Sequence, residues 1–205
     1  KDFLINGTEN DTKHYKEFLE KSKGFMTTAQ QSVGNPELGQ QLKAAADKID
    51  QFDATFGKIV AIKGERDKLV ANLDRLGLSM EQTLTEIMDK AAKTGATHTG
   101  YTAGLTIRSL LIGRLHASRF LDTGLPADAE QVLTDLTELE PALKDLKGSL
   151  LRVEWQALVE DITKNLGEYQ AAFTVLAAKT KERNGLVATS LDKLGPEIIE
   201  SADKI

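Results

Sequence analysis

Apolar residues recur along the chain in alternating steps of three and four, the spacing of one face of an α-helix. The longest series runs from Leu38 to Ile87. It predicts one helix of about fifty residues, roughly 75 Å long at 1.5 Å per residue. A second long helix is expected from about Leu151, with a seam from Trp155 to Val187. Shorter helices are expected over about 11–33, 97–122 and 127–147. No stretch shows the period of two typical of a strand, so the predicted fold class is all-α.

Turn-forming residues interrupt the helical pattern. Gly34-Asn35-Pro36 and Gly148-Ser149 each precede a long helix and are expected to close a hairpin. Thr94-Gly95-Ala96-Thr97 is expected to form a third turn. Gly124-Leu125-Pro126 is expected to separate two collinear helices.

The two halves of the chain resemble each other. A shift of 117 residues makes 15 of 72 aligned positions identical, among them Phe3-Leu4 with Phe120-Leu121 and Glu65-Arg66 with Glu182-Arg183. After a further one-residue shift, Leu73-Asp74 meets Leu191-Asp192. The repeat predicts a duplicated unit made of a short helix, a break, a second short helix, a turn and a long helix. Two such units would form two four-helix bundles stacked end to end that share the two long helices.

The expected division of the chain follows from this arrangement. One bundle would contain about 1–6, 60–123 and 177–205, and the other about 8–59 and 125–176. The first half has no counterpart of residues 97–122. We therefore expect that the sequence starts inside a helix and that about 25 residues of that helix lie outside it.

Composition narrows the functional classes. The 205 residues carry a net charge of −5 without a basic stripe, which disfavours a nucleic-acid partner. The absence of cysteine excludes disulfides and a thiol nucleophile. The sequence contains no HExxH, P-loop, GxGxxG or GxSxG motif, and the three histidines are scattered. We expect a protein that is not an enzyme and that uses no cofactor or metal.

Arginines provide the candidate site. Arg66 and Arg183 are equivalent in the repeat and occupy seam positions where apolar residues are expected. Arg114 continues an apolar series of its own helix, and counting residues from the turns places it, with Arg119 nearby, at a similar height. We expect Arg66, Arg114 and Arg183 to converge below the junction of the bundles.

Buried arginines need anions. A small di- or tricarboxylate would match the guanidinium groups with bidentate hydrogen bonds. Further contacts are expected from hydroxyl groups on Tyr101, Thr102, Thr106, Thr180 and Thr189. The alternative is that the arginines extend to solvent or pair with Asp and Glu between helices.

Segments at both ends of the chain resemble segments of a known protein family. Lys1-Asp2-Phe3-Leu4 with Gly7 and Asp11, and the segment Leu191-Asp192-Lys193-Leu194-Gly195-Pro196-Glu197-Ile198, are similar to the helical bimodular ligand-binding domain of bacterial methyl-accepting chemoreceptors. The resemblance implies a periplasmic sensor domain between two transmembrane helices that lie outside this sequence. It also implies a homodimer that binds organic acids such as tricarboxylic-acid-cycle anions, with one membrane-proximal and one membrane-distal pocket. The input domain of a sensor histidine kinase and a purely structural helical bundle remain alternatives.

Overall fold

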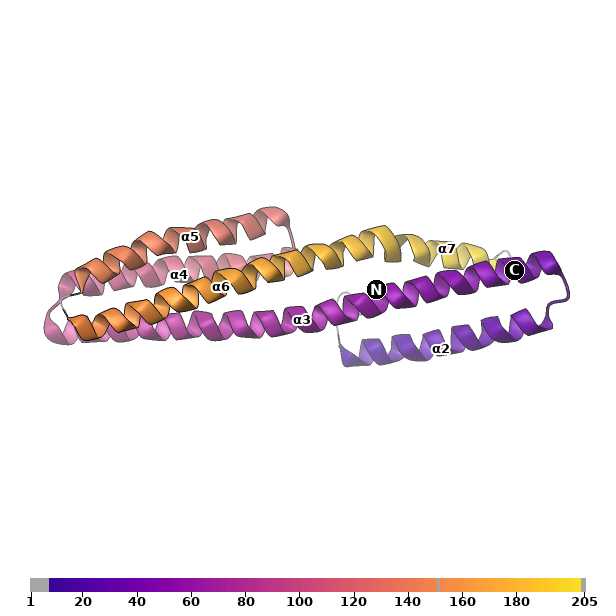
Figure 1. The fold of residues 1–205 in the computed structure, drawn as a ribbon, viewed down its shortest axis with the longest axis horizontal. Coiled ribbons are helices and arrows are strands. Elements are labelled where there is room, and N and C mark those ends of the chain that lie inside the picture. Colours follow the sequence, from indigo (N-terminus) through magenta and orange to yellow (C-terminus); the bar gives the residue numbers. More distant parts are fainter. Residues whose placement is uncertain (1–7, 151, 204–205) are drawn as a thin grey trace. The chain divides into compact units, whose positions relative to one another are not determined.

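The computed structural model describes residues 8–150 and 152–203, and their regular structure is entirely helical (Figure 1). The elements are α2 (Glu9–Ser32), α3 (Pro36–Thr94), α4 (Thr97–Thr123), α5 (Pro126–Ser149), α6 (Val153–Leu186), the π-helical segment η1 (Val187–Leu191) and α7 (Asp192–Asp203). The all-α prediction is confirmed. Predictions that concern Phe3-Leu4 and residues 1–6 fall outside the described residues.

The helices end at the predicted turns. Gly95 and Gly124 have φ angles of 71° and 62°, a left-handed conformation that glycine adopts without steric cost. Pro36 and Pro126 occupy the first position of α3 and α5, where a missing N–H costs no helical hydrogen bond. With 59 residues, α3 is longer than the pattern suggested, because it starts at Pro36 and continues to Thr94.

The chain forms two compact units. The unit we call unit 2 comprises Arg66–Lys181, and unit 1 comprises the described residues on both sides of it, 8–65 and 182–203. The long helices α3 and α6 contribute residues to both units, since the boundaries at residues 65/66 and 181/182 fall inside them.

Unit 2 packs four helical segments around one hydrophobic core. The core combines buried residues of α3, α4, α5 and α6, including Met80, Leu110, Leu136 and Phe173. The rings of Phe120 and Phe173 meet edge to face, with centroids 5.3 Å apart. Burial of this apolar surface is the main source of stability in the unit.

The prediction that residues on either side of Gly124 form collinear helices is wrong. The helices α4 and α5 pack antiparallel, side by side, within unit 2 (Figure 1). Thr99 donates to the Ser149 carbonyl at 2.7 Å near one end of this pair, and Arg119 meets Asp128 at 3.1 Å near the other. The physical reason is the left-handed conformation of Gly124. It turns the chain back, so that α5 runs beside α4 and does not continue its axis.

Because α4 and α5 form this hairpin, the compact units differ from the bundles that the sequence predicted. Residues 97–123 and 126–149 belong to the same unit, whereas we expected 97–123 with 60–96 and 177–205, and 125–176 with 8–59. The expected bundles and the observed units therefore differ in which short helices they contain.

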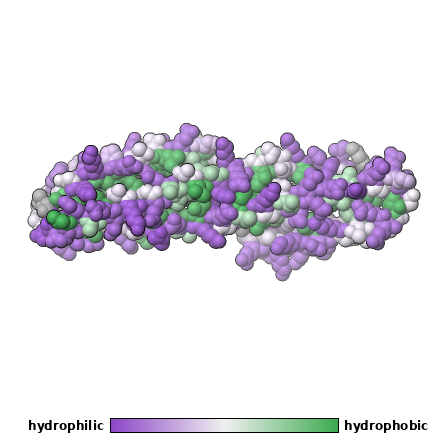
Figure 2. Space-filling view, viewed as in Figure 1, coloured by the Kyte–Doolittle hydropathy of each residue, from purple (hydrophilic) through white to green (hydrophobic). Residues whose placement is uncertain are grey.

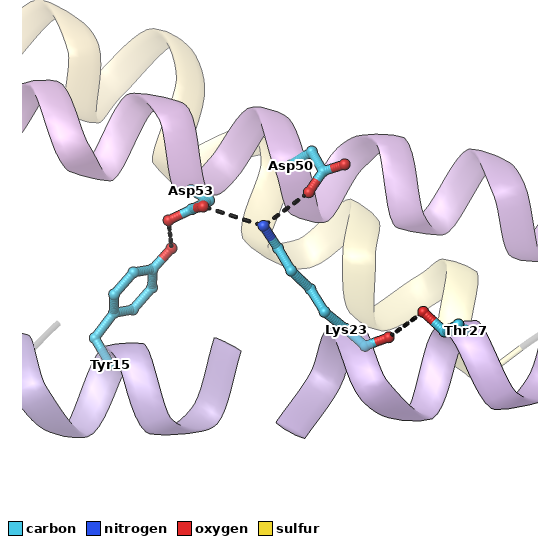
Figure 3. A network of polar contacts seen from close by, with 5 residues as sticks. All are labelled: Tyr15, Lys23, Thr27, Asp50 and Asp53. Carbon is cyan, nitrogen blue, oxygen red and sulfur yellow. Dashed lines mark hydrogen bonds and ion pairs between the residues drawn. The ribbon is translucent and has the colours of Figure 1, made fainter. Parts of the chain in front are cut away.

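Unit 1 has a smaller core. It centres on Phe56, Ile59 and Leu191, from α3 and η1, and α2 contains no buried residue. Tyr15 of α2 stacks on Phe56 with ring centroids 3.8 Å apart. Lys23 of α2 forms ion pairs with two aspartates of α3 (Figure 3). These contacts attach α2 to α3 mainly along one side.

A π-helical turn interrupts the second long helix, which the pattern had predicted to be continuous. It covers Val187–Leu191, between α6 and α7. The alignment of the two halves needs its one-residue shift at this place, between Ala188 and Leu191. A π turn accommodates one extra residue inside an α-helix, so the local structure agrees with the position of the shift.

Candidate functional site

Unit 2 contains a pocket of about 500 Å³ between α3, α4 and α6. Seven of its eleven lining residues are apolar, and four carry polar groups. The apolar residues include Val70, Leu73, Leu111, Leu115, Leu121 and Leu176. The polar residues are Asp74, Arg114, Ser118 and Tyr169. An apolar pocket with a few convergent polar groups is the usual form of a small-molecule site.

Arg114 is the cationic group of this pocket. Its Nη1 donates to Glu81 Oε2 at 2.8 Å, and both side chains are partly exposed. The guanidinium lies against α3 at Gly77, where an added Cβ would come within 2.7 Å of Arg114 Nε. Glu81 uses one of the five N–H donors of the guanidinium, so further donors are available for a carboxylate.

Tyr169 supplies a buried hydroxyl group to the same pocket. Burial raises its pKa to about 12, while the charge of Arg114 acts in the opposite direction and Asp74 raises the pKa further. The side chain is 3% exposed. A tyrosine phenol is protonated at neutral pH even at its ordinary pKa of 10.0, and it can donate a hydrogen bond to an anionic ligand.

The charges around the pocket limit the ligands that suit it. Arg114 contributes one positive charge, whereas Asp74 lines the pocket and Glu81 pairs with Arg114. A ligand with several negative charges would meet repulsion from these carboxylates. A single carboxylate attached to a small apolar body fits the lining better.

The other predicted arginines have different surroundings. Arg119 of α4 pairs with Asp128 of α5 at 3.1 Å, although the Arg119 side chain is 65% exposed. Arg66 lies half-buried on α3 in unit 2. Arg183 belongs to unit 1, where its Nε and Nη2 donate to Asn184 Oδ1 at 3.0 and 2.7 Å, and burial lowers its pKa. The convergence of Arg66, Arg114 and Arg183 stays a prediction.

The hydroxyl groups proposed as ligand contacts lie in two kinds of surroundings. Thr102, Thr106 and Thr180 are buried, and each donates to a carbonyl of its own helix at 2.9 Å. In this packing of the helices, their side chains are almost inaccessible to a ligand. Tyr101 is 65% exposed, and Thr189 donates to Gly185 from an exposed position. None of the five lines the Arg114 pocket.

Sequence reasoning missed three residues of this pocket region, Asp74, Glu81 and Tyr169. Tyr169 falls within the predicted seam from Trp155 to Val187, and its counterpart in the repeat is Phe52. The added hydroxyl at a seam position was the available signal, because a buried phenol needs a polar partner. Asp74 and Glu81 gave no signal, since acidic residues are common on exposed helix faces.

Within the described ranges, no group of three or more His, Asp or Glu side chains could hold a metal ion. No helix in this part of the chain is long and apolar enough to cross a membrane. No protein-family model matches the sequence, and no curated protein matches it either.

Proposed function

We propose that this chain is the extracytoplasmic sensor domain of a chemotaxis receptor and that it binds a small organic acid in the Arg114 pocket of unit 2. The observation that supports the proposal is a cation and a protonated hydroxyl, from Arg114 and Tyr169, which line a pocket of about 500 Å³ together with leucine and valine side chains. A guanidinium and a phenol are suitable donors for one carboxylate.

The charge of the pocket favours monocarboxylates over the di- and tricarboxylates that the sequence suggested. Asp74 and Glu81 offset the positive charge of Arg114, so a second ligand carboxylate has no cation among the pocket residues. In this proposal the carboxylate binds Arg114 and Tyr169, and the ligand's carbon chain lies against the leucines of the pocket.

The proposal includes the wider organisation expected from the family resemblance. The domain would lie in the periplasm, be attached to the membrane by helices outside this sequence and form a homodimer. The domain would consist of two stacked four-helix bundles that arose by duplication. A ligand that bridges α3, α4 and α6 favours one packing of these helices over another, which is a physical basis for signalling by helix displacement. The same input could serve a sensor histidine kinase.

A structural role is the second candidate, and specific contacts favour it. Arg114 and Arg119 already have carboxylate partners in Glu81 and Asp128. If these pairs only hold helices together, the pocket needs no ligand.

A thermal-shift screen of organic acids separates the two candidates. Ligand at a hundredfold excess over its Kd stabilises the folded state by about 2.7 kcal/mol, which raises the Tm by several degrees in a chain of this size. We expect short apolar monocarboxylates to raise the Tm of the wild type more than dicarboxylates do. Arg114→Gln should remove the response, whereas Arg108→Gln, an exposed change on the same helix, should keep it. If no acid raises the Tm, the structural role is the better account.

A further inference from the structure

The helices α2 and α5 correspond position by position under the 117-residue shift, but equivalent side chains are less buried in α2 than in α5. Besides Asp135, which is treated below, seven positions of α5 are buried: Asp128, Ala129, Val132, Leu136, Leu139, Leu143 and Leu146. Their counterparts in α2 are all half-buried: Asp11, Thr12, Tyr15, Leu19, Ser22, Met26 and Ala29. The same face therefore points inward in both helices. In α2, the described residues cover this face only in part.

The α5 face owes part of its burial to α4. Along this contact, His116 of α4 bonds to Asp135 of α5, and Arg119 of α4 pairs with Asp128. Asp135 is 9% exposed as a result. The flank of α5 that carries these two aspartates is thus the side on which α4 packs.

The corresponding flank of α2 is apolar and exposed. The counterpart of Asp135 is Phe18, which is 72% exposed, and Phe25 follows seven residues later with 76% of its surface exposed. Residues seven apart lie on one stripe of a helix. Two exposed phenylalanines on one stripe are unusual, because each can bury 150–250 Å² on contact with a partner.

The contacts between α2 and α3 lie on other residues of the inward face. Tyr15 and Lys23 reach Asp53 of α3, and Lys23 also pairs with Asp50 (Figure 3). At 100° per residue, Tyr15 and Lys23 lie about 60° and 140° from Phe18 around α2. The attachment to α3 therefore leaves the stripe of Phe18 and Phe25 without cover.

We propose that the stripe of Phe18 and Phe25 is a docking surface for one further amphipathic helix, which packs antiparallel to α2 as α4 packs against α5. The inference rests on the internal repeat and not on ligand binding. The residue of the docked helix that faces Phe18 is apolar, because Phe18 replaces the aspartate that pairs with His116 in unit 2. A continuous apolar stripe on the docked helix replaces the polar pairs of the α4–α5 contact.

A fusion that supplies such a helix tests the proposal in the full chain. The sequence of residues 97–117 is joined ahead of Lys1, which keeps the 117-residue spacing, and the fused copy carries His116→Leu. Amide hydrogen exchange in α2 is then compared between the fused and the unfused chain. We expect exchange in α2 to slow at least tenfold in the fused chain, because a covered helix opens less often.

Two variants of the fused chain provide the control. Phe18→Glu places a charge on the docking stripe, and it should remove the added protection. Gln31→Glu introduces the same side chain about 140° away on an exposed part of α2, and it should keep the protection. Equal protection in both variants, or none in the fused chain, would overturn the proposal. The proposal would also be overturned if the unfused chain formed a dimer in sedimentation that Phe18→Glu dissociates, because a second copy would then be the occupant.

Discussion

The guanidinium of Arg114 lies against the backbone of Gly77, one helix away. A Cβ at residue 77 would come within 2.7 Å of Arg114 Nε, closer than Cβ atoms approach other atoms in proteins, and within 3.0 Å of its Cδ, which is a very tight contact. The glycine therefore allows Arg114 to lie along α3, where it reaches Glu81 at 2.8 Å.

Gly77→Ala should displace Arg114 without unfolding the protein. Alanine is favoured over glycine in a helix by about 0.5–1 kcal/mol, which offsets the cost of moving a flexible side chain. We expect the free energy of unfolding to change by less than about 1 kcal/mol, while the NMR signal of the Arg114 Nε–H group shifts. Gly57→Ala, in the same helix with no atom within 4 Å of an added Cβ, should leave that signal in place. An unchanged Arg114 signal in Gly77→Ala would contradict this geometry.

The His116–Asp135 pair should stabilise the contact between α4 and α5. Asp135 is buried and also accepts a hydrogen bond from Gln131 at 2.9 Å. Removing one partner leaves the other without its hydrogen bond, so Asp135→Leu should cost about 1–3 kcal/mol in denaturant unfolding.

A double-mutant cycle isolates the energy of this pair. With His116→Leu as the second change, we expect a coupling of at least about 1 kcal/mol. The exposed pair of Lys147 and Glu160, 3.0 Å apart, should give less than about 0.5 kcal/mol in the same experiment. Similar values for the two pairs would mean that burial adds nothing to the α4–α5 contact.

Stability should fall between about pH 10 and pH 12 because of Tyr169. Its pKa is raised from 10.0 to about 12 in the folded state, mainly by burial. Above pH 10 the unfolded chain loses this proton while the folded chain keeps it, so the unfolded state is favoured as pH rises. The contribution is present in full below pH 10 and is lost as pH approaches 12, with an upper limit of about 2–3 kcal/mol.

Tyr169→Phe should reduce this loss of stability, measured as the slope of unfolding free energy against pH. Tyr101→Phe removes an exposed phenol and should leave the slope as it is. Burial also raises the pKa of Tyr15, so part of the slope should persist in Tyr169→Phe. Identical slopes in the wild type and in Tyr169→Phe would show that the phenol is not buried in solution.

Deletion of Thr189 should be tolerated. The π turn at Val187–Leu191 accommodates one residue more than an α-helix would, so removing one residue restores regular α-helix without rotating the flanking segments. We expect the Tm to change by no more than a few degrees. Deletion of Val175, an exposed residue in the regular part of α6, rotates the following residues by 100° and moves Leu176 out of the core. That deletion should lower the Tm by at least 10 °C, and equal effects of the two deletions would contradict the π turn.

The helices and their ends could be predicted from the sequence because the signals are local. The spacing of apolar residues marks the helix faces, and Gly95, Gly124, Pro36 and Pro126 mark the ends. The direction of the chain after Gly124 could not be predicted in this way. It depends on one backbone angle and on the contact between α4 and α5, which local periodicity does not contain.

The candidate site was predicted only in part. The seam position of Arg114 pointed to an inward-facing arginine, and equal counts from the turn at Gly95 would have led to residue 76, next to Gly77. The partner Glu81 could not be predicted, because a long arginine side chain reaches more than a turn along a neighbouring helix. The π turn was visible in the sequence as a one-residue shift, but a shift alone does not show whether a loop or a helix accommodates it.

Calorimetric titration with the organic acid that raises the Tm most is the most direct test of the proposed function. Three proteins are compared: the wild type, Arg114→Gln and Arg108→Gln. Loss of a charge-assisted hydrogen bond of about 1.5–3 kcal/mol weakens binding by about 10- to 150-fold. We predict this loss for Arg114→Gln and a change of less than about twofold for Arg108→Gln, which alters the same charge on the same helix away from the pocket. Equal Kd values for the two variants would contradict a carboxylate site at Arg114.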